Sequence, residues 1–220
     1  MHDIQIAGTT ETYQVGKILC IGRNYAKHAA EMGGSVPDEP WVFLKPSSAI
    51  IRTGESVVLP KKSNDVHHEV ELVALIGKLG KNLSVVEALG VVRGYAVGLD
   101  MTARDLQSAA KAARSPWSIA KGFDTFAPLG PVLPADEVKD PQDLIIQLSV
   151  NGEIRQSGST RDMIFSVAEL ISFCSECFTL FPGDLLYTGT PDGVGPVHVG
   201  DQLVAKIEGL PKLKVAVIDS

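Results

Sequence analysis

The 220-residue chain contains only three cysteines, Cys20, Cys174 and Cys177, and an odd number at uneven spacing does not form a disulfide framework. Cys174 and Cys177 make a C-x-x-C pair. They come late in a helix-like pattern that starts at 166, not at the start of a helix that follows a strand, so we expect packing and not redox chemistry. A zinc site would need a second pair of ligands, which the sequence does not offer.

Basic runs and long apolar runs are missing as well. The net charge is −6, the pI is near 5.4, and the one small basic pair is Lys61-Lys62, which excludes a surface that tracks nucleic-acid phosphates. No stretch approaches the roughly 20 apolar residues that a membrane helix needs, and residues 1–5 do not begin a signal peptide. We therefore expect a cytosolic protein with no nucleic-acid or membrane partner.

Strand patterns outnumber helix patterns along the chain. An Asn-Gly turn at 151–152 predicts a hairpin between 144–150 and 154–156, and Ser84 three residues before Glu87 predicts a capped helix. Pro and Gly are scattered, and no linker or repeat interrupts the chain. We predict a single domain over 1–220 with a mixed, β-dominated α/β fold. The expected strands cover 17–22, 41–46, 57–60, 70–76, 91–99, 184–188, 202–208 and 213–218.

Acidic residues occupy alternate positions in the segment His67-His68-Glu69-Val70-Glu71-Leu72. The period of two in a strand points Glu69 and Glu71 to one face. A second apolar run, 94–99, ends on Asp100. If the strands of Glu71 and Asp100 are neighbours, three carboxylates converge, and they repel one another unless protons or a cation offset their charge.

Two interpretations of these acids are open on spacing alone. One is a solvated strand face, which is the commoner origin of acids at alternate positions. The other is a metal site, because an all-oxygen ligand set without cysteine favours a hard ion, Mg²⁺ before Mn²⁺ or Ca²⁺.

Two further segments carry polar groups of interest. Region 24–32 is typical of a short helix or lid, in which His28 and Glu31 share a face, so Glu31 can orient His28 as a general base; a surface ion pair is the alternative. Loop 189–195 is rich in glycine but lacks the Lys-Ser/Thr ending of a P-loop, which favours a turn that lines a site. There the Thr190 hydroxyl and backbone N–H groups can hold a substrate carboxylate.

Six motifs taken together resemble the fumarylacetoacetate hydrolase family, in order from about residue 17 to the C-terminus. The chain is most similar to the small acylpyruvase and oxaloacetate decarboxylase branch, which lacks an SH3-like N-terminal domain, and residues 1–16 are expected to pack on the domain as an extension. The motifs are Cys20-Ile21-Gly22-Arg23-Asn24-Tyr25, Phe43-Leu44-Lys45-Pro46, His68-Glu69-Val70-Glu71-Leu72, Asp100-Met101-Thr102-Ala103-Arg104-Asp105, Asn151-Gly152-Glu153-Ile154-Arg155-Gln156 and Gly189-Thr190-Pro191-Asp192-Gly193-Val194-Gly195.

The resemblance implies a rolled, mixed β-sheet with short flanking helices, assembled as a homodimer. It implies Mg²⁺ or Mn²⁺ held by Glu69, Glu71 and Asp100, in agreement with the strand argument. The larger hydrolases supply an extra Asp ligand from the N-terminal side, whereas region 24–28 here contains no acid. Water or substrate is therefore expected to fill that position.

The resemblance also implies further site residues. Lys121 would steady an enolate or deliver a proton to it, and Arg104 and Gln107 would hold substrate oxygens, although Arg104 also has Asp105 and Glu71 as alternative partners. Arg23 and Lys45 would bind a distal carboxylate or only cap strand ends. The predicted set is catalytic His28, Glu31 and Lys121, substrate-binding Arg23, Lys45, Arg104, Gln107 and Thr190, and metal-binding Glu69, Glu71 and Asp100.

The chemistry implied by this set begins with chelation of a small 2-oxo acid, whose enolate a divalent ion stabilises when a bond to C3 breaks. The leading prediction is a Mg²⁺-dependent hydrolase of a carbon–carbon bond in acylpyruvate-type 3-oxo acids, with oxaloacetate decarboxylation as a second activity. One alternative is an isomerase or tautomerase acting on oxaloacetate or on an aromatic-degradation intermediate. An alternative of another class is a non-catalytic ligand-binding or redox module built on Cys174 and Cys177.

Overall fold

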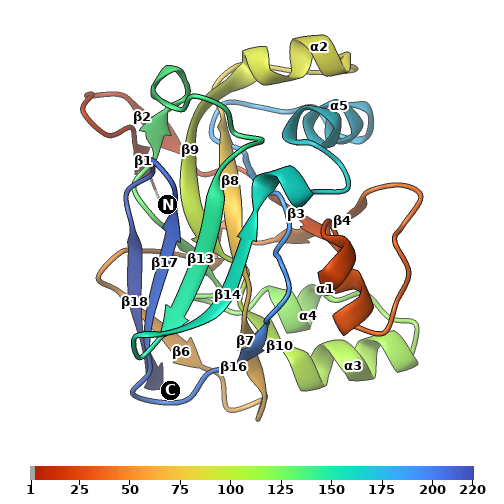
Figure 1. The fold of residues 1–220 in the computed structure, drawn as a ribbon, viewed down its shortest axis with the longest axis vertical. Helices are drawn as coiled ribbons and strands as arrows, with labels where there is room; N and C mark the ends of the chain where they lie inside the picture. Colours follow the sequence, from red (N-terminus) through yellow and green to blue (C-terminus); the bar gives the residue numbers. More distant parts are fainter. Residues whose placement is uncertain (1–2) are drawn as a thin grey trace.

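Two β-sheets pack face to face in the computed structural model, which describes residues 3–220 (Figure 1). The larger sheet has the order β4 (Trp41–Lys45), β3 (Ile18–Gly22), β15 (Leu185–Tyr187), β8 (Val70–Ile76), β9 (Val92–Leu99), β11 (Ala127–Leu129) and β5 (Ile50–Arg52), and β12 (Leu133–Pro134) pairs with β9. The smaller has the order β14 (Glu153–Ser159), β13 (Ile145–Val150), β17 (Gln202–Ile207), β18 (Leu213–Asp219) and β6 (Ser56–Leu59). The β-dominated fold predicted from the sequence is confirmed.

The remaining strands form two small sheets. The N-terminal pair is β1 (Asp3–Gln5) with β2 (Thr12–Gln14), and the other is β10 (Thr102–Ala103), β7 (Val66–His68) and β16 (Gly195–Pro196). Ile4 and Ile6 of the N-terminal segment are buried, so residues 3–16 pack on the body of the domain.

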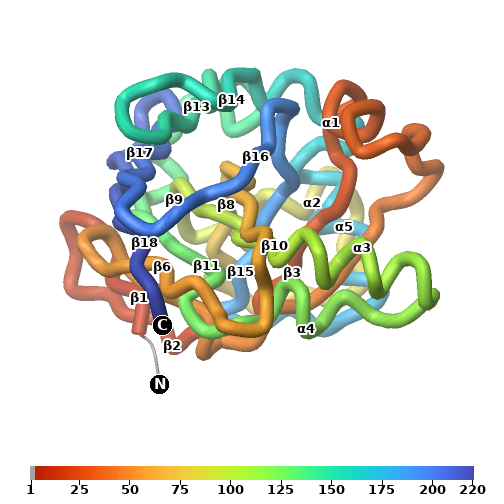
Figure 2. The backbone as a smooth tube through the Cα atoms, turned by 90° about the horizontal axis from the view of Figure 1, so that it is seen from below, coloured from red at the N-terminus to blue at the C-terminus, as the bar shows by residue number. Residues whose placement is uncertain are grey.

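Short helices flank the sheets, and none of them within 3–220 is long and apolar enough to span a bilayer. Viewed from below, α3 and α4 lie on the opposite side of the molecule from β17 and β18 (Figure 2). The helices are α1 (Ala26–Glu31), α2 (Val85–Ala88), α3 (Arg104–Ala112), α4 (Ser118–Lys121) and α5 (Val167–Cys177), and single 3₁₀ turns cover Ser47–Ala49, Leu89–Val91, Ala135–Glu137 and Thr160–Asp162.

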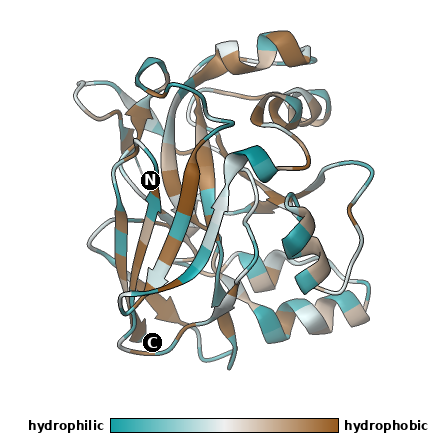
Figure 3. Cartoon of the chain, in the orientation of Figure 1, coloured by the Kyte–Doolittle hydropathy of each residue, from teal (hydrophilic) through white to brown (hydrophobic). Residues whose placement is uncertain are grey.

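The larger sheet is covered on both faces, so all seven residues of β8 are buried. Leu72 and Ala74 contribute to the core between the two sheets, whereas Val73 and Leu75 face the opposite core under the N-terminal strands. Figure 3 shows hydrophobic residues concentrated along these strands and hydrophilic ones along the loops. Glu71 precedes Val73 by two and so points to the same face as Val73, at the end of the strand.

Local signals in the sequence account for several elements. Asn151 and Gly152 both have positive φ, 52° and 87°, and join β13 to β14, as the Asn-Gly turn predicts. The capping box at Ser84 and Glu87 is also present. The lid predicted at 24–32 contains α1, a helix of six residues.

The prediction that Glu69 and Glu71 lie on one continuous strand is wrong. β7 ends at His68 and β8 begins at Val70, so Glu69 lies where the chain passes from the three-stranded sheet to the larger sheet. The chain that pairs with this segment also changes sheets, because β9 pairs with β8 in the larger sheet and β10 pairs with β7 in the three-stranded sheet. Between β9 and β10, the Asp100 N–H donates to the Glu69 carbonyl at 2.8 Å. A corner between sheets therefore brings Glu69 and Asp100 together.

Candidate metal centre and active site

Glu69, Glu71 and Asp100 converge at this corner, with oxygen atoms that all lie within 4.8 Å of one another. Each residue is at most 4% exposed. Glu71 pairs across the sheet with Gly98, where an added Cβ would come within 2.6 Å of Val73 and Tyr187 side-chain atoms. The pairing of β8 with β9 confirms that the two acidic strands are neighbours, and the burial excludes a solvated strand face.

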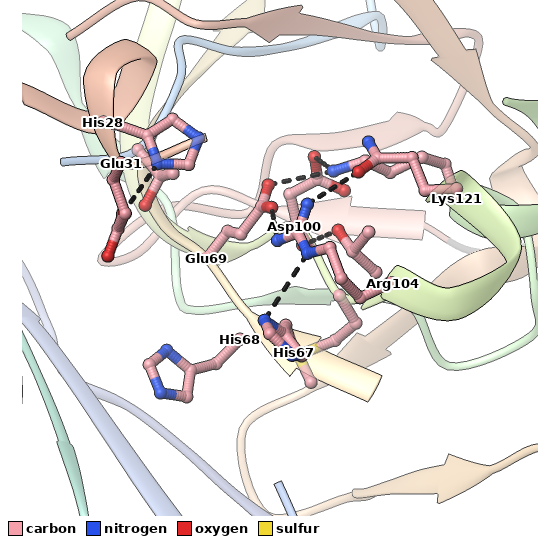
Figure 4. A network of polar contacts seen from close by, with 12 residues as sticks. His28, Glu31, His67, His68, Glu69, Asp100, Arg104 and Lys121 are labelled. Atoms are coloured by element: carbon pink, nitrogen blue, oxygen red, sulfur yellow. Dashed lines mark hydrogen bonds and ion pairs between the residues drawn. The ribbon is translucent and has the colours of Figure 1, made fainter. Parts of the chain in front are cut away.

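Glu69 is the best-paired of the three acids. It accepts a hydrogen bond from Lys121 Nζ at 2.9 Å and forms an ion pair with Arg104 (Figure 4). Burial raises the pKa of Glu69, but Lys121 and Arg104 outweigh this effect and hold the pKa well below its usual value. Glu69 is therefore an anion in the folded protein.

Among residues 3–220, no Lys or Arg side chain forms an ion pair with Glu71. Glu71 accepts a hydrogen bond from the Gly189 N–H at 2.8 Å. Burial raises the pKa of Glu71 well above its usual value, and the charges of Asp100 and Glu69 add to the rise. A divalent cation bound here would offset the repulsion among the three carboxylates.

Asp100 is held by two lysines from the other side. Lys121 Nζ donates to Asp100 Oδ2 at 2.5 Å, and Lys45 Nζ lies 2.6 Å from Asp100 Oδ1. The three N–H groups of Lys45 are directed at the carbonyls of Met101, Lys121 and Phe126. Asp100 Oδ1 therefore receives charge attraction from Lys45 but no hydrogen bond, and it remains a buried acceptor without a donor.

These observations fit a divalent metal ion. The donors are all carboxylate oxygens, and within residues 3–220 Glu71 forms no ion pair with a Lys or Arg side chain, which together suit a hard cation. Glu69, Glu71 and Asp100 would hold the ion, as the sequence predicts.

Lys45 is the one predicted substrate-binding residue that the structure does not bring to the cleft. Its Nζ is buried under Asp100 and is fully occupied by main-chain carbonyls. Its geometry is that of a support for the Asp100 turn, and it does not reach substrate.

A narrow cleft opens above the acids, and it contains the other predicted residues apart from Glu31. Arg104 Nη1 donates to Gln107 Oε1 at 2.7 Å, and its ion pair is with Glu69, not with the alternatives Asp105 or Glu71. Arg23 stacks on Trp41, with its guanidinium carbon 4.6 Å from the ring centre. The lining residues are Ile21, Gly22, Arg23, His28, Met32, Phe43, Glu69, Glu71, Asp100, Arg104, Gln107, Lys111, Trp117, Lys121 and Thr190.

Helix α1 covers one side of the cleft with a side-chain pair. His28 Nδ1 lies 3.2 Å from Glu31 Oε2, and the other Glu31 oxygen accepts from the Gly193 N–H at 3.1 Å. In Figure 4 the His28 ring and Lys121 lie on either side of the carboxylates. His28 is only 5% exposed and lines the cleft, whereas Glu31 is exposed, so the pair joins the cleft to the surface of the molecule.

Lys111 was not predicted as a site residue, although its spacing from Arg104 and Gln107 indicates a shared helix face. Arg104, Gln107 and Lys111 are positions i, i+3 and i+7 of α3, which share one helix face. Lys111 lies over the Trp117 ring at 5.2 Å and adds a further cation to the cleft. Burial lowers its pKa, and Arg104 and Arg23 lower it further.

Gln156 was also missed as a site residue. It is fully buried and bridges Val70, between the two glutamates, to Thr190 in the glycine-rich loop. The register of β13 and β14 shifts between Leu148 and Ser149, so alternation counted from the turn does not reveal which way Gln156 faces.

The C-x-x-C pair lies in α5, where Cys174 is buried, Cys177 is exposed, and both are free thiols. Burial raises the pKa of Cys174 to about 12, and Cys177 adds to the rise. A redox pair needs a lowered thiol pKa, so this geometry does not support the redox alternative.

Comparisons with known proteins agree with the site. Residues 17–218 match the model of the fumarylacetoacetate hydrolase C-terminal family. A mitochondrial oxaloacetate tautomerase of Arabidopsis thaliana is 50% identical over 90% of this chain and 89% of its own, and a mitochondrial oxaloacetate decarboxylase of Dictyostelium discoideum is 47% identical over 88% and 89%. The crystal structure of fumarylpyruvate hydrolase from Pseudomonas aeruginosa, in complex with Mn²⁺ and pyruvate, superposes with a TM-score of 0.95 at 43% identity, over 100% of this chain and 96% of the other.

Proposed function

This chain belongs to the fumarylacetoacetate hydrolase family, and from its site we propose that it is a divalent-metal enzyme that forms and protonates the enolate of a short 2-oxo dicarboxylic acid. The proposal rests on two features of the same cleft. One is the buried centre of three carboxylates, and the other is the set of basic side chains around it. When bound, Mg²⁺ or Mn²⁺ would polarise the 2-oxo group and stabilise negative charge on its oxygen.

The cations of the cleft favour an anionic substrate. Arg104 and Lys121 lie beside the carboxylates, while Arg23 and Lys111 lie at aromatic rings farther out in the cleft. An acid with carboxylates at both ends places one negative charge near each group of cations. This arrangement supports a dicarboxylate such as oxaloacetate over a neutral ketone.

The proposed chemistry uses two groups on opposite sides of the centre, one that transfers a proton and one that stabilises charge. His28, oriented by Glu31, takes a proton from C3 of the substrate or returns one to it. Lys121, whose pKa is raised by Asp100 and Glu69 against the lowering effect of burial, stays charged and stabilises developing negative charge. Conversion of enol-oxaloacetate to the keto form then balances: the O–H proton of the enol leaves to water as the enolate forms, His28 gives a proton to C3, and His28 recovers a proton from water.

The relatives support tautomerisation as the first reaction to test, because several of them at 45% to 50% identity are named oxaloacetate tautomerases. Hydrolysis of a carbon–carbon bond in an acylpyruvate is the second candidate. It is favoured by the likeness to fumarylpyruvate hydrolase and by a histidine–carboxylate pair that can activate water. Decarboxylation of oxaloacetate needs the same stabilised enolate and fewer protein groups.

A side-by-side assay tests the proposal. The purified protein is treated with a chelator, reloaded with Mg²⁺ or Mn²⁺, and given enol-oxaloacetate, oxaloacetate, acetylpyruvate and fumarylpyruvate. We expect metal-dependent turnover of at least one of them, with enol-oxaloacetate converted fastest. Turnover that survives chelation, or no turnover of any of the four with metal restored, contradicts the proposal.

Assembly and location are further parts of the proposal. We propose a homodimer, supported by the edge strand β4, on which Trp41 and Leu44 are 43% and 46% exposed. Sedimentation at micromolar concentration is expected to give about 47 kDa, twice the 23.4 kDa of the chain.

A cytoplasmic location is proposed as well, and because some relatives are named mitochondrial, it is tested by fractionation of the source cells.

A further inference from the structure

Gln156 makes four polar contacts from a fully buried position. Its Oε1 accepts from the Val70 N–H at 3.1 Å and lies 3.0 Å from His68 Nδ1. Its Nε2 lies 2.9 Å from the Pro191 carbonyl and 2.8 Å from Thr190 Oγ1. The side chain thus joins the segment that carries Glu69 and Glu71 to the glycine-rich loop.

These partners leave the Gln156 amide a single orientation. A main-chain N–H can only donate, so the atom beside Val70 is the oxygen. A main-chain carbonyl can only accept, so the atom beside Pro191 is the nitrogen. Both N–H groups are then used, one toward Pro191 and one toward Thr190.

The orientation of Gln156 determines what Thr190 can do. Since Gln156 is the donor, the Thr190 hydroxyl oxygen is the acceptor, and the hydroxyl hydrogen must point elsewhere. Within residues 3–220 no acceptor is hydrogen-bonded to that hydroxyl, and Thr190 lines the cleft while only 2% exposed. The hydrogen is therefore available to an oxygen atom of a bound ligand.

We propose that Gln156 is a positioning residue that fixes Thr190 as a hydrogen-bond donor to a carboxylate or carbonyl oxygen of the substrate. The inference rests on the proposed function for the identity of that ligand. It explains why a buried glutamine, and not an apolar residue, spans the gap between the acidic strand and the loop: an apolar side chain would leave the Thr190 hydroxyl free to turn away from the cleft.

The test uses oxalate as a chelating mimic of a 2-oxo carboxylate. Mn²⁺ affinity is measured first, from the paramagnetic resonance signal of the free ion, and oxalate affinity of the Mn²⁺-loaded protein is then measured by titration calorimetry. Gln156→Glu keeps the acceptor toward Val70 but replaces the donor toward Thr190 with an oxygen, so the Thr190 hydroxyl turns toward residue 156. Thr190→Val removes the hydroxyl, and Thr190→Ser retains it.

Gln147→Glu is the matched control. Gln147 lies on the same hairpin and donates to Ser157 Oγ at 3.2 Å, but it does not line the cleft. Gln156→Met, an apolar side chain of similar length, is the second variant if Gln156→Glu does not fold.

We expect Gln156→Glu and Thr190→Val each to weaken oxalate binding about tenfold, since a hydrogen bond to a charged group is lost in both. The double variant should bind no more weakly than Thr190→Val alone, because both changes remove one interaction. Thr190→Ser and Gln147→Glu should bind oxalate like the wild type, and Mn²⁺ affinity should stay within about threefold throughout. A merely structural glutamine would not show this coupling to Thr190.

Three results overturn the inference. They are wild-type oxalate affinity in Gln156→Glu, losses that multiply in the double variant, and a fall in Mn²⁺ affinity equal to the fall in oxalate affinity. A wild-type protein that binds no Mn²⁺, or binds Mn²⁺ but no oxalate, refutes the proposed function itself and removes the inference with it, so the two failures are distinguishable.

Discussion

The acidic centre (Glu69, Glu71 and Asp100) and helix α1 above it differ in how the surrounding structure fixes them in place. The three acids are deeply buried at a corner between sheets, with Glu71 on β8, Glu69 between β7 and β8, and Asp100 just after β9. Helix α1 has six residues and no side-chain cap at Tyr25, and a helix this short is not stable in isolation. The contact of Glu31 with Gly193 ties it to the glycine-rich loop.

This difference divides the chemistry between two regions. In the proposed mechanism, the groups that would stabilise an enolate belong to the buried centre, and the histidine that would move protons belongs to the six-residue helix α1. Reactions that share the enolate should therefore all depend on the centre, while the choice among them should depend on α1.

Glu71→Gln should have the largest effect. It removes an anionic ligand, so we expect Mg²⁺ affinity to fall at least about tenfold and turnover of every substrate to be lost. The apo-protein should remain folded, because the pKa of Glu71 is already raised by burial and by its acidic neighbours, and a glutamine oxygen can still accept from Gly189.

Calorimetric titration with Mg²⁺ measures the change, and the exposed Glu137→Gln serves as the control with the same change of charge. Mg²⁺ affinity within threefold of the wild type in Glu71→Gln would remove Glu71 from the ligand set.

His28→Ala should separate the reactions. Loss of a positioned general base costs about a hundredfold to ten-thousandfold, so tautomerisation and acylpyruvate hydrolysis should fall by that order, and decarboxylation should fall much less. Oxalate and Mg²⁺ affinity should be nearly unchanged, because His28 is not among the three acids. The comparison is of kcat for each substrate, with the exposed His198→Ala as control. Equal losses on all substrates would show that α1 orders the whole site and would remove the division of roles.

Lys45→Met should affect stability more than any other change outside the ligands. The substitution leaves three main-chain carbonyls and Asp100 without their buried cation, which should lower the free energy of unfolding by about 3–5 kcal/mol. Urea unfolding of the chelator-treated protein measures it. Lys111→Met is the matched control, because Lys111 makes only a ring contact and its loss should cost about 1 kcal/mol or less. Similar losses in both variants would contradict the supporting role of Lys45.

The smallest effect is expected for the paired change of Cys174 and Cys177 to Ala. Burial of Cys174 raises its pKa, so no reactive thiolate forms there, and turnover should be unchanged. Loss of activity in a variant that stays folded would restore the redox interpretation.

The sequence predicts the centre well because its signals are local. Alternation places Glu69 and Glu71 on one face, and an apolar run delivers Asp100 to the end of the next strand. The corner at Glu69 was not predictable from alternation, because the change of pairing partner from β10 to β9 depends on strands elsewhere in the chain.

The rest of the site depends on contacts between segments far apart in the chain. Lys45 resembles a substrate-binding lysine by sequence alone, and only its three carbonyl partners, which lie 56 to 81 positions away, reveal its role. Gln156 is 88 positions from His68, and a register shift in its hairpin hides its direction. Such residues become evident only when the sheets are assembled.

Mn²⁺ resonance with labelled oxalate tests whether the three carboxylates hold a divalent ion on which a 2-oxo acid chelates. The Mn²⁺-loaded protein is mixed with oxalate made with ¹⁷O and, separately, with unlabelled oxalate. We expect the ¹⁷O label to broaden the Mn²⁺ lines in the wild type, because a coordinated oxygen nucleus couples to the ion. Unbroadened lines under conditions where calorimetry shows oxalate bound, or oxalate affinity that persists after chelation of the metal, would contradict the account.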